Sequence, residues 1–241
     1  MNRIIAILVG LVALTAASTV HAFPHLYMWS DPANGQPGGN PSLAPGAGLL
    51  YGTGGAKERG ITCALCHIKA PGTIGATVTP SVPWQVIGNG NGYKPGMQYT
   101  ITVTMTGETK NPGTVDNLNG FALTIENAAG NGVGTFATDQ NPAVTTANCT
   151  NTRVLGAAET NLVTAGVTTY MISPSNAGGG CYTVVSVPKL GATSWTFKWT
   201  APAMGSGPVT IYYGVVDGDH GGTDSKGDDV KQGTIKLVEG P

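Results

Sequence analysis

The chain has few charged residues, few histidines and few cysteines. Only 10% of its 241 residues are charged, and 12 Lys and Arg against 13 Asp and Glu leave a formal net charge of −1. A nucleic-acid partner needs a basic face, which this balance excludes. Four histidines offer no obvious general base, and no Ser/His/Asp order, phosphate loop or paired-carboxylate arrangement stands out. Whether the chain is an enzyme stays open, and electron transfer or binding is favoured over catalysis.

Long hydrophobic runs are absent after the N-terminus, where residues 1–22 have the pattern of a signal peptide. Arg3 gives a positive start, an apolar run follows over 4–17, and Val20-His21-Ala22 is a small-residue cleavage site. The run is shorter than the roughly 20 residues that a membrane helix needs. Residues 236–241 carry no hydrophobic tail. We therefore expect a mature chain without a transmembrane segment, exported to the periplasm, the cell surface or the medium.

One short motif carries recognisable chemistry, Cys63-x-x-Cys66-His67. This is the spacing for covalent attachment of a c-type haem. Two thiols three residues apart reach the two vinyl groups of one porphyrin, and the histidine that follows becomes the proximal ligand of the iron. The motif predicts one covalent haem c, held by Cys63 and Cys66 as thioethers and by His67 through the iron.

Three other interpretations of the motif stay open. Cys63 and Cys66 can form a local disulfide, or a redox dithiol, although that motif needs a strand-to-helix context that is not visible here. They can also be half of a zinc site completed by Cys149 and Cys181, although the second pair of such a site normally has its own short spacing. In an oxidising compartment we expect Cys149 and Cys181 to form a disulfide, since only this connectivity spares the motif.

The second axial ligand of a haem iron is not fixed by the motif. His220, in a polar loop, and His25 and Met28, in the N-terminal region, are the candidates, and a vacant position is equally consistent with the sequence. Met105 belongs to an apolar strand face and is expected in the core. Met97 follows a Pro-Gly turn, where its side chain is free to point away from the core. Met171 and Met204 complete the set of methionines considered.

A cluster of aspartates lies in the same polar loop as His220. Asp217, Asp219 and Asp228, with Gly222, resemble the spacing of a calcium loop, but the fifth position is Gly221 and the twelfth is Asp rather than Glu. A calcium site is therefore one expectation, and a solvated turn is the other. The full cluster is Asp217, Asp219, Asp224, Asp228 and Asp229.

Turn-forming residues divide the rest of the chain into short pieces. The 37 glycines and 16 prolines recur at short intervals, and no helical period is visible. Residues 23–75 are expected to form an irregular Gly/Pro-rich arm that bears the cysteine motif and packs on the domain. Residues 76–241, by contrast, are expected to form one all-β domain.

Strict alternation of apolar and polar residues marks the strands of that domain. Segment 98–106 places Tyr99, Ile101, Val103 and Met105 on one face and threonines on the other. Further strands are expected over 120–126, 169–172, 182–187, 194–200, 209–216 and 234–238. Seven or more short strands predict an immunoglobulin-like sandwich of two sheets.

Several short motifs resemble a known family. Gly92-Tyr-Lys-Pro-Gly-Met-Gln-Tyr-Thr-Ile-Thr-Val103, Gly120-Phe-Ala-Leu123, Trp199-Thr-Ala-Pro202 and Gly207-Pro-Val-Thr-Ile-Tyr212 resemble the Reeler-type domain and its bacterial "choice-of-anchor V" relatives. In those relatives a Gly-rich leader with a CxxCH precedes the Tyr-x-Pro-Gly strand entry. The resemblance covers roughly residues 55–238. It implies an immunoglobulin-like sandwich in a secreted or cell-surface setting, and little about chemistry.

Two functions of different classes follow from these observations. The first is an exported monohaem protein that transfers electrons to a redox partner the sequence does not name. The second is a secreted or surface interaction domain in which Cys63 and Cys66 form a disulfide. The haem protein explains why His67 follows Cys66 directly, and the interaction domain does not.

Overall fold

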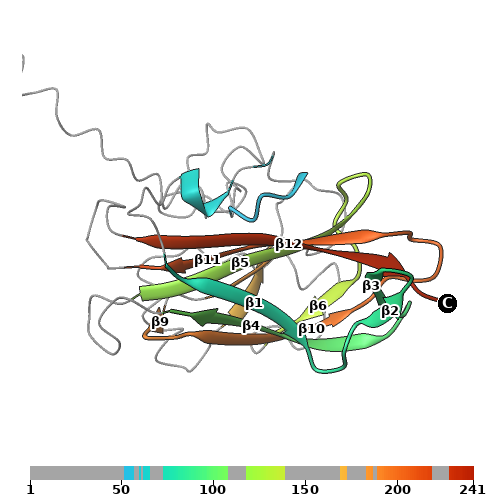
Figure 1. Cartoon of the computed structure of the whole chain (residues 1–241), viewed down its shortest axis with the longest axis horizontal. Coiled ribbons are helices and arrows are strands. Elements are labelled where there is room, and N and C mark those ends of the chain that lie inside the picture. Colours follow the sequence, from blue (N-terminus) through green and yellow to red (C-terminus); the bar gives the residue numbers. More distant parts are fainter. Residues whose placement is uncertain are drawn as a thin grey trace, which may run out of the picture.

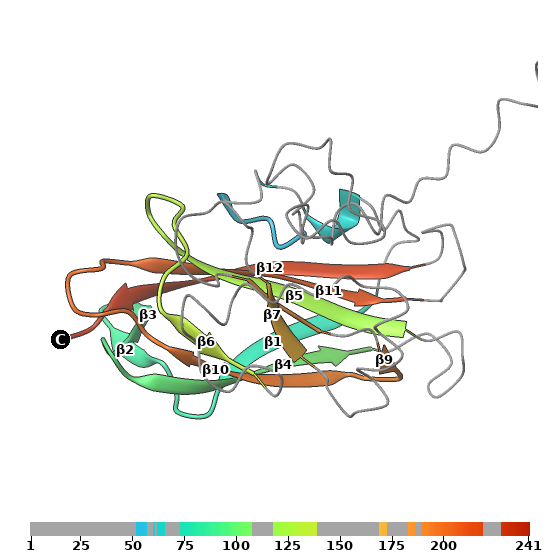
Figure 2. The same cartoon turned by 180° about the vertical axis from the view of Figure 1, so that it is seen from behind.

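The computed structural model describes a β-sandwich of two sheets with one short helix outside it (Figure 1). The described residues are 52–56, 60, 62–65, 73–107, 118–138, 169–172, 183–186, 189–218 and 228–241. Seen from either side, the two sheets lie one above the other and the cysteine-bearing segment lies beyond the upper sheet (Figure 2). The all-β sandwich expected from the sequence is confirmed.

The smaller sheet has four strands, in the order β1-β4-β10-β6. Every neighbouring pair in it is antiparallel. Its strands are β1 (Gly75–Pro80), β4 (Gln98–Thr106), β6 (Thr135–Ala137) and β10 (Ser194–Thr200).

The larger sheet has eight strands, in the order β2-β3-β12-β11-β5-β8-β7, with β9 also pairing with β5. The pairing of β12 with β3 is parallel and the others are antiparallel. Its strands are β2 (Gln85–Ile87), β3 (Gly90–Tyr93), β5 (Leu118–Asn127), β7 (Thr169–Ile172), β8 (Thr183–Ser186), β9 (Lys189–Leu190), β11 (Val209–Asp217) and β12 (Asp229–Glu239).

The core lies between the two sheets and consists of the side chains that alternation predicted. Strand β10 shows the pattern clearly, because its inner residues are buried while Ser194, Thr196 and Lys198 are exposed. Tyr99 and Trp199 stack with ring centroids 5.9 Å apart, joining two strands of the smaller sheet. The buried inner rows are Tyr99, Ile101, Val103 and Met105; Phe121, Leu123 and Ile125; Trp195, Phe197 and Trp199; and Val209, Ile211, Tyr213 and Val215.

The opposite faces of β5 and β11 include Gly214, Ala122, Thr210 and Glu126. The register pairs Gly214 with Ala122 and Thr210 with Glu126 across these two strands. These residues alternate along the strands with the residues of the inner row, so their side chains point away from the core. On this outer face lies η3, a 3-10 helix over Cys63–Leu65. The cysteine motif therefore begins on the outside of the sandwich, separated from the core by the larger sheet.

Candidate functional site

Cys63 is held against the outer face of the larger sheet by its backbone and its sulfur together. Its N–H donates to the carbonyl oxygen of Gly52 at 2.8 Å. Its Sγ donates to the same oxygen at 3.3 Å. An added Cβ on Gly214, in the middle of β11, would come within 2.5 Å of Sγ. The thiol thus lies between the Gly52 carbonyl and a strand position where only glycine leaves room for it.

The segment around Gly52 forms a strap, residues 52–56, that runs beside the cysteine turn. Thr53 pairs with Thr62 in an antiparallel bridge. The N–H of Gly60 donates to the carbonyl oxygen of Gly55 at 3.0 Å, which closes the connection between the two short pieces. Gly52 has φ of 76°, a left-handed conformation that glycine adopts without strain. The strap and the turn therefore form one small hydrogen-bonded unit.

A buried carboxylate joins this unit to the sheet. Oε2 of Glu126, near the end of β5, accepts the N–H of Ala56 at 2.8 Å. Glu126 is only 1% exposed. Gly55 lies directly over this carboxylate, since a Cβ there would collide with Oε1 of Glu126 and come within 2.9 Å of Thr124 Cγ2. Alternation alone did not identify Glu126 as a site residue, because its partner lies 70 positions away in the sequence.

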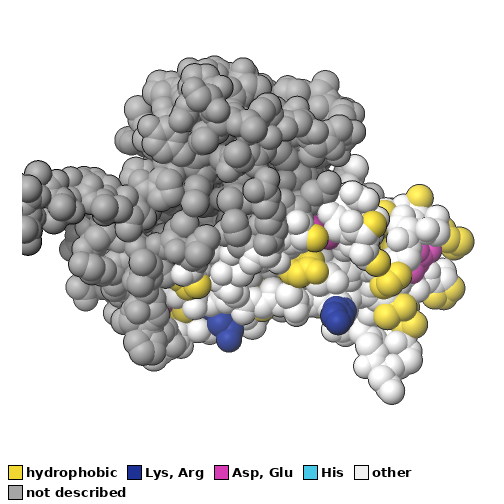
Figure 3. Space-filling view, turned by 90° about the horizontal axis from the view of Figure 1, so that it is seen from above, with side chains coloured by type: hydrophobic (Ala, Val, Ile, Leu, Met, Phe, Trp, Pro, Cys, Tyr) yellow, Lys and Arg dark blue, Asp and Glu magenta, His cyan; other side chains and the backbone are white. Residues whose placement is uncertain are grey.

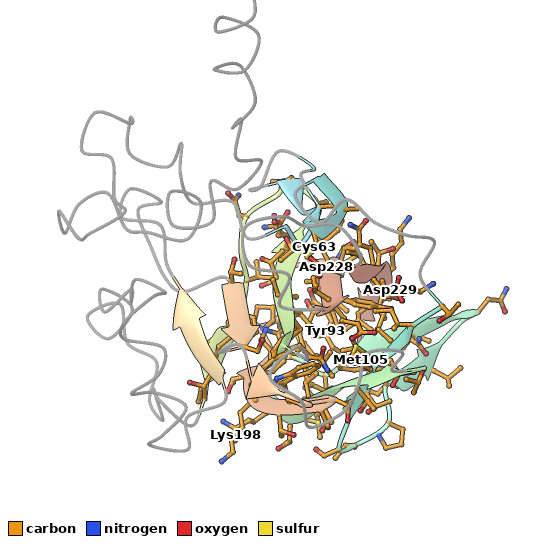
Figure 4. The ribbon with its side chains drawn as sticks, turned by 90° about the vertical axis from the view of Figure 1, so that its left-hand side faces the viewer. Cys63, Tyr93, Met105, Lys198, Asp228 and Asp229 are labelled. Carbon is orange, nitrogen blue, oxygen red and sulfur yellow. The ribbon has the colours of Figure 1, made fainter. Side chains whose placement is uncertain are left out.

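Of the residues predicted to hold a haem, Cys63 is the one that the structure describes. It is partly exposed and lies on the outer side of the larger sheet, whereas Tyr93 and Met105 lie within the sandwich and Lys198 projects from the smaller sheet (Figure 4). The following predicted site residues lie outside the described part of the chain: Cys66, His67, His25, Met28, His220, Asp219, Cys149 and Cys181.

Three aspartates of the β11–β12 connection, Asp217, Asp228 and Asp229, lie within the described residues and are buried. Asp217 and Asp229 are paired residues at the ends of β11 and β12. Asp217 is 0% exposed, and Asp228 and Asp229 are each 5% exposed. Among the described residues no group of three or more His, Cys, Asp or Glu side chains is placed to hold a metal ion. The calcium prediction also needs Asp219, so it stays a prediction.

The methionines fall into three environments. Met105 is 3% exposed and lies in the core, as expected. Met97 packs partly against the core, so the expectation that it points away is wrong; the backbone bond from Ala201 N–H to the Met97 carbonyl holds this turn against the next loop. Met204 is 72% exposed. The side chain of Met171 lies outside the described set.

The motifs that carry the family resemblance meet at one end of the sandwich. The hydroxyl of Tyr93 donates to the carbonyl oxygen of Gly207 at 2.7 Å. Gly96 N–H donates to the carbonyl of Pro202 at 3.0 Å, which ties the Tyr-x-Pro-Gly turn to the Trp-x-Ala-Pro turn. Glu239 accepts the N–H groups of Gly205 at 2.6 Å and Gly207 at 2.5 Å. These residues form a clamp that stabilises the fold.

The electrostatics of the clamp shift two pKa values in opposite directions. Burial, followed by the charge of Glu239 and its hydrogen bond, raises the pKa of Tyr93 to about 12. Hydrogen bonds from the backbone N–H groups of Gly205 and Gly207 lower the pKa of Glu239. Both shifts favour a neutral tyrosine next to a charged carboxylate.

Two further findings concern the surface and the helices of the described part of the chain. In the view from above, the Lys and Arg side chains that can be seen lie apart from one another and form no basic patch on the described part of this face (Figure 3). No helix in the described ranges is long and apolar enough to cross a membrane.

Comparison with known proteins agrees with the resemblance found in the sequence. The Reeler domain family model matches residues 64–182, just under half of the chain. The chain is similar to the Reelin-N domain of F-spondin, at 18% identity and a TM-score of 0.39, over 72% of this chain and 91% of that one. It is also similar to the human F-spondin reeler domain (fragment 1), at 16% identity and a TM-score of 0.39, over 71% and 94%. No curated protein sequence matches the chain.

Proposed function

We propose that this chain is an exported Reeler-type β-sandwich that carries one covalent haem c at Cys63, Cys66 and His67 and transfers electrons to a redox partner. The motif supplies the chemistry, and the sandwich supplies a stable support. The observation that supports the proposal is the position of Cys63, partly exposed on the outer face of the larger sheet and held there by the hydrogen bond from its N–H to Gly52, a bond that thioether formation at the sulfur leaves in place.

The local backbone at Cys63 fits the spacing of the motif. Cys63–Leu65 form a 3-10 helix, in which side chains three positions apart lie over one another. The described turn starts at Cys63, the first residue of the motif.

The larger sheet separates Cys63 from the core side chains. The core side chains lie on the other side of the larger sheet, so attachment at Cys63 displaces none of them. A bound haem would supply one-electron redox chemistry, with His67 as the iron ligand and Cys63 and Cys66 as thioether anchors. The chain contributes a cysteine held by its backbone N–H and a sheet beneath it.

The visible spectrum of the exported protein tests this proposal. The full chain is produced with a haem-attachment system, and Cys66→Ser and His67→Ala are made as variants. We expect a reduced c-type spectrum in the wild type, a reduced band shifted by the loss of one thioether in Cys66→Ser, and altered iron coordination in His67→Ala. All three proteins should keep the same far-UV circular dichroism. A wild type that shows no haem spectrum would refute the proposal.

The second candidate is a secreted interaction domain with a Cys63–Cys66 disulfide and no haem. It is favoured by the Reeler match and by large hydrophobic side chains left at the surface, which often mark binding sites when they gather. Val86 is 83% exposed and Met204 is 72% exposed, with Val82 and Val238 at 44% and 42%. For either candidate we propose an extracytoplasmic setting, with association at the cell surface as one form of it.

A further inference from the structure

We infer that Glu126 is a positioning residue for the Cys63 thiol: its buried carboxylate holds the strap whose Gly52 carbonyl fixes Cys63 on the sheet. The reason for positioning this thiol rests on the proposed haem attachment. The hydrogen-bonded connection itself is independent of haem and can be tested without it.

The first link is the bond between the sheet and the strap. Glu126 lies at an outward-facing position of β5, paired with Thr210 of β11. A carboxylate that is 1% exposed is costly unless hydrogen bonds compensate it. The Ala56 N–H, at 2.8 Å from Oε2, is one such bond, and bonds to a charged acceptor are among the stronger ones. Glu126 therefore anchors the far end of the strap.

The second link is the close fit of the strap over the carboxylate. A Cβ on Gly55 would collide with Glu126 Oε1, and a Cβ on Gly130 would come within 2.7 Å of the Ala56 Cβ. Two glycines thus leave room for the backbone to approach Glu126. A side chain at either position would push the strap away from the sheet.

The third link joins the strap to the thiol. The Thr53–Thr62 bridge holds the strap beside the turn, and Gly52 accepts both the N–H and the S–H of Cys63. Because these bonds share one carbonyl, a displacement of the strap removes both together. The thiol then loses its fixed place over Gly214.

Amide hydrogen exchange on the full mature chain, produced without haem, tests the connection. In Glu126→Ala we expect exchange of the peptide that covers residues 52–65 to accelerate about tenfold or more, since a buried bond to a charged group is lost. Peptides from β4 and β10 should keep their protection. Glu126→Gln keeps an acceptor oxygen and should restore most of the protection. Glu239→Ala is the matched control, because it removes a carboxylate that accepts backbone N–H groups elsewhere.

A thiol measurement separates positioning from simple stabilisation. The rate of Cys63 alkylation by iodoacetamide, measured in proteins that all carry Cys66→Ser so that Cys63 stays reduced and is the one thiol of its peptide, should rise in Glu126→Ala, return toward the reference protein in Glu126→Gln and stay unchanged in Glu239→Ala. If Glu126→Ala does not fold, Gly55→Ala replaces it and should give the same local result. Unchanged exchange and alkylation at 52–65 in a folded Glu126→Ala or Gly55→Ala protein would overturn the inference.

These outcomes are separate from those of the proposed function. One outcome is that the wild type takes up no haem while Glu126→Ala still accelerates exchange of residues 52–65. This result would refute the haem proposal and support the positioning role of Glu126. When haem is attached, Glu126→Ala should lower the fraction of chains that carry it, and Glu239→Ala should not.

Discussion

The sulfur of Cys63 occupies the space that a side chain at Gly214 would need, since a methyl group added at Gly214 would come within 2.5 Å of Sγ. Gly214 lies in the middle of β11, paired with Ala122 on one side and Gln232 on the other. The contact shows that the cysteine turn is seated on the backbone of the sheet itself. This close seating underlies the first prediction.

Replacing Gly214 by alanine should move the cysteine turn without damaging the core. Overpacking costs about 1–3 kcal/mol, and we expect a cost in this range because the added methyl group would meet both Cys63 Sγ and, at 3.2 Å, the carbonyl oxygen of Gly52. Urea unfolding should show this loss, and the yield of attached haem should fall. Gly90→Ala is the control, since a Cβ there has nothing nearer than 3.9 Å. Equal haem yields in the two variants would contradict the seating.

Truncating the core should have a much larger effect on stability. Leu123 is 0% exposed at the centre of the larger sheet, so Leu123→Ala should lower the free energy of unfolding by about 2–5 kcal/mol. Val86→Ala, at a side chain that is 83% exposed, should change it by less than about 0.5 kcal/mol. Chemical denaturation monitored by tryptophan fluorescence measures both. Similar losses in the two variants would mean that Leu123 is not a core residue.

The clamp predicts an alkaline loss of stability. Because folding raises the pKa of Tyr93 from 10.0 to about 12, the folded state favours the neutral hydroxyl. This contribution is complete below pH 10 and is lost as the pH rises through about 12. Tyr93→Phe should flatten stability over this range and cost about 1 kcal/mol at pH 7, because the bond to Gly207 is removed. Tyr213, whose pKa burial also raises, remains in both proteins.

Glu239, the acidic residue of the clamp, predicts a loss of stability at low pH, whereas Tyr93 predicts one at high pH. Hydrogen bonds from Gly205 and Gly207 lower the pKa of Glu239 below the usual 4.5. The contribution of Glu239 to folding stability is therefore fully present at pH values above the pKa of this residue in the unfolded chain. It is lost as the pH falls through the lower pKa of the folded protein. Glu239→Gln should make the thermal midpoint less dependent on pH below about 4.5. An unchanged acid profile in this variant would show that Glu239 does not govern it.

Much of the sandwich could be predicted because its long strands alternate. Strand β4 has the predicted bounds, Gln98–Thr106, since one face packs in the core and the other carries threonines. Strand β3, Gly90–Tyr93, has no such alternation and escaped prediction. Strand β12 begins at Asp229, five residues before the predicted start. Its early residues are polar, and they are held by pairing with β11 rather than by apolar contacts.

The candidate site was predictable in chemistry and not in geometry. The spacing of Cys63 and Cys66 can be recognised in the sequence, because covalent attachment of haem requires the two cysteines at this distance. Nothing local indicates that Glu126, at the end of an apolar strand, meets Ala56, or that Gly214 leaves room for a sulfur. Both depend on segments that tertiary folding brings together. The burial of Asp217 was not indicated by its polar, Gly-rich surroundings in the sequence either.

The intact mass of the mature protein, made with complete export and haem-attachment machinery, tests the central claim most directly. We expect the mass of the chain after removal of residues 1–22 plus that of one haem, with the added group located on the peptide that contains Cys63 and Cys66. A mass equal to that of the bare chain, with the two cysteines reduced or oxidised to each other, would contradict the account.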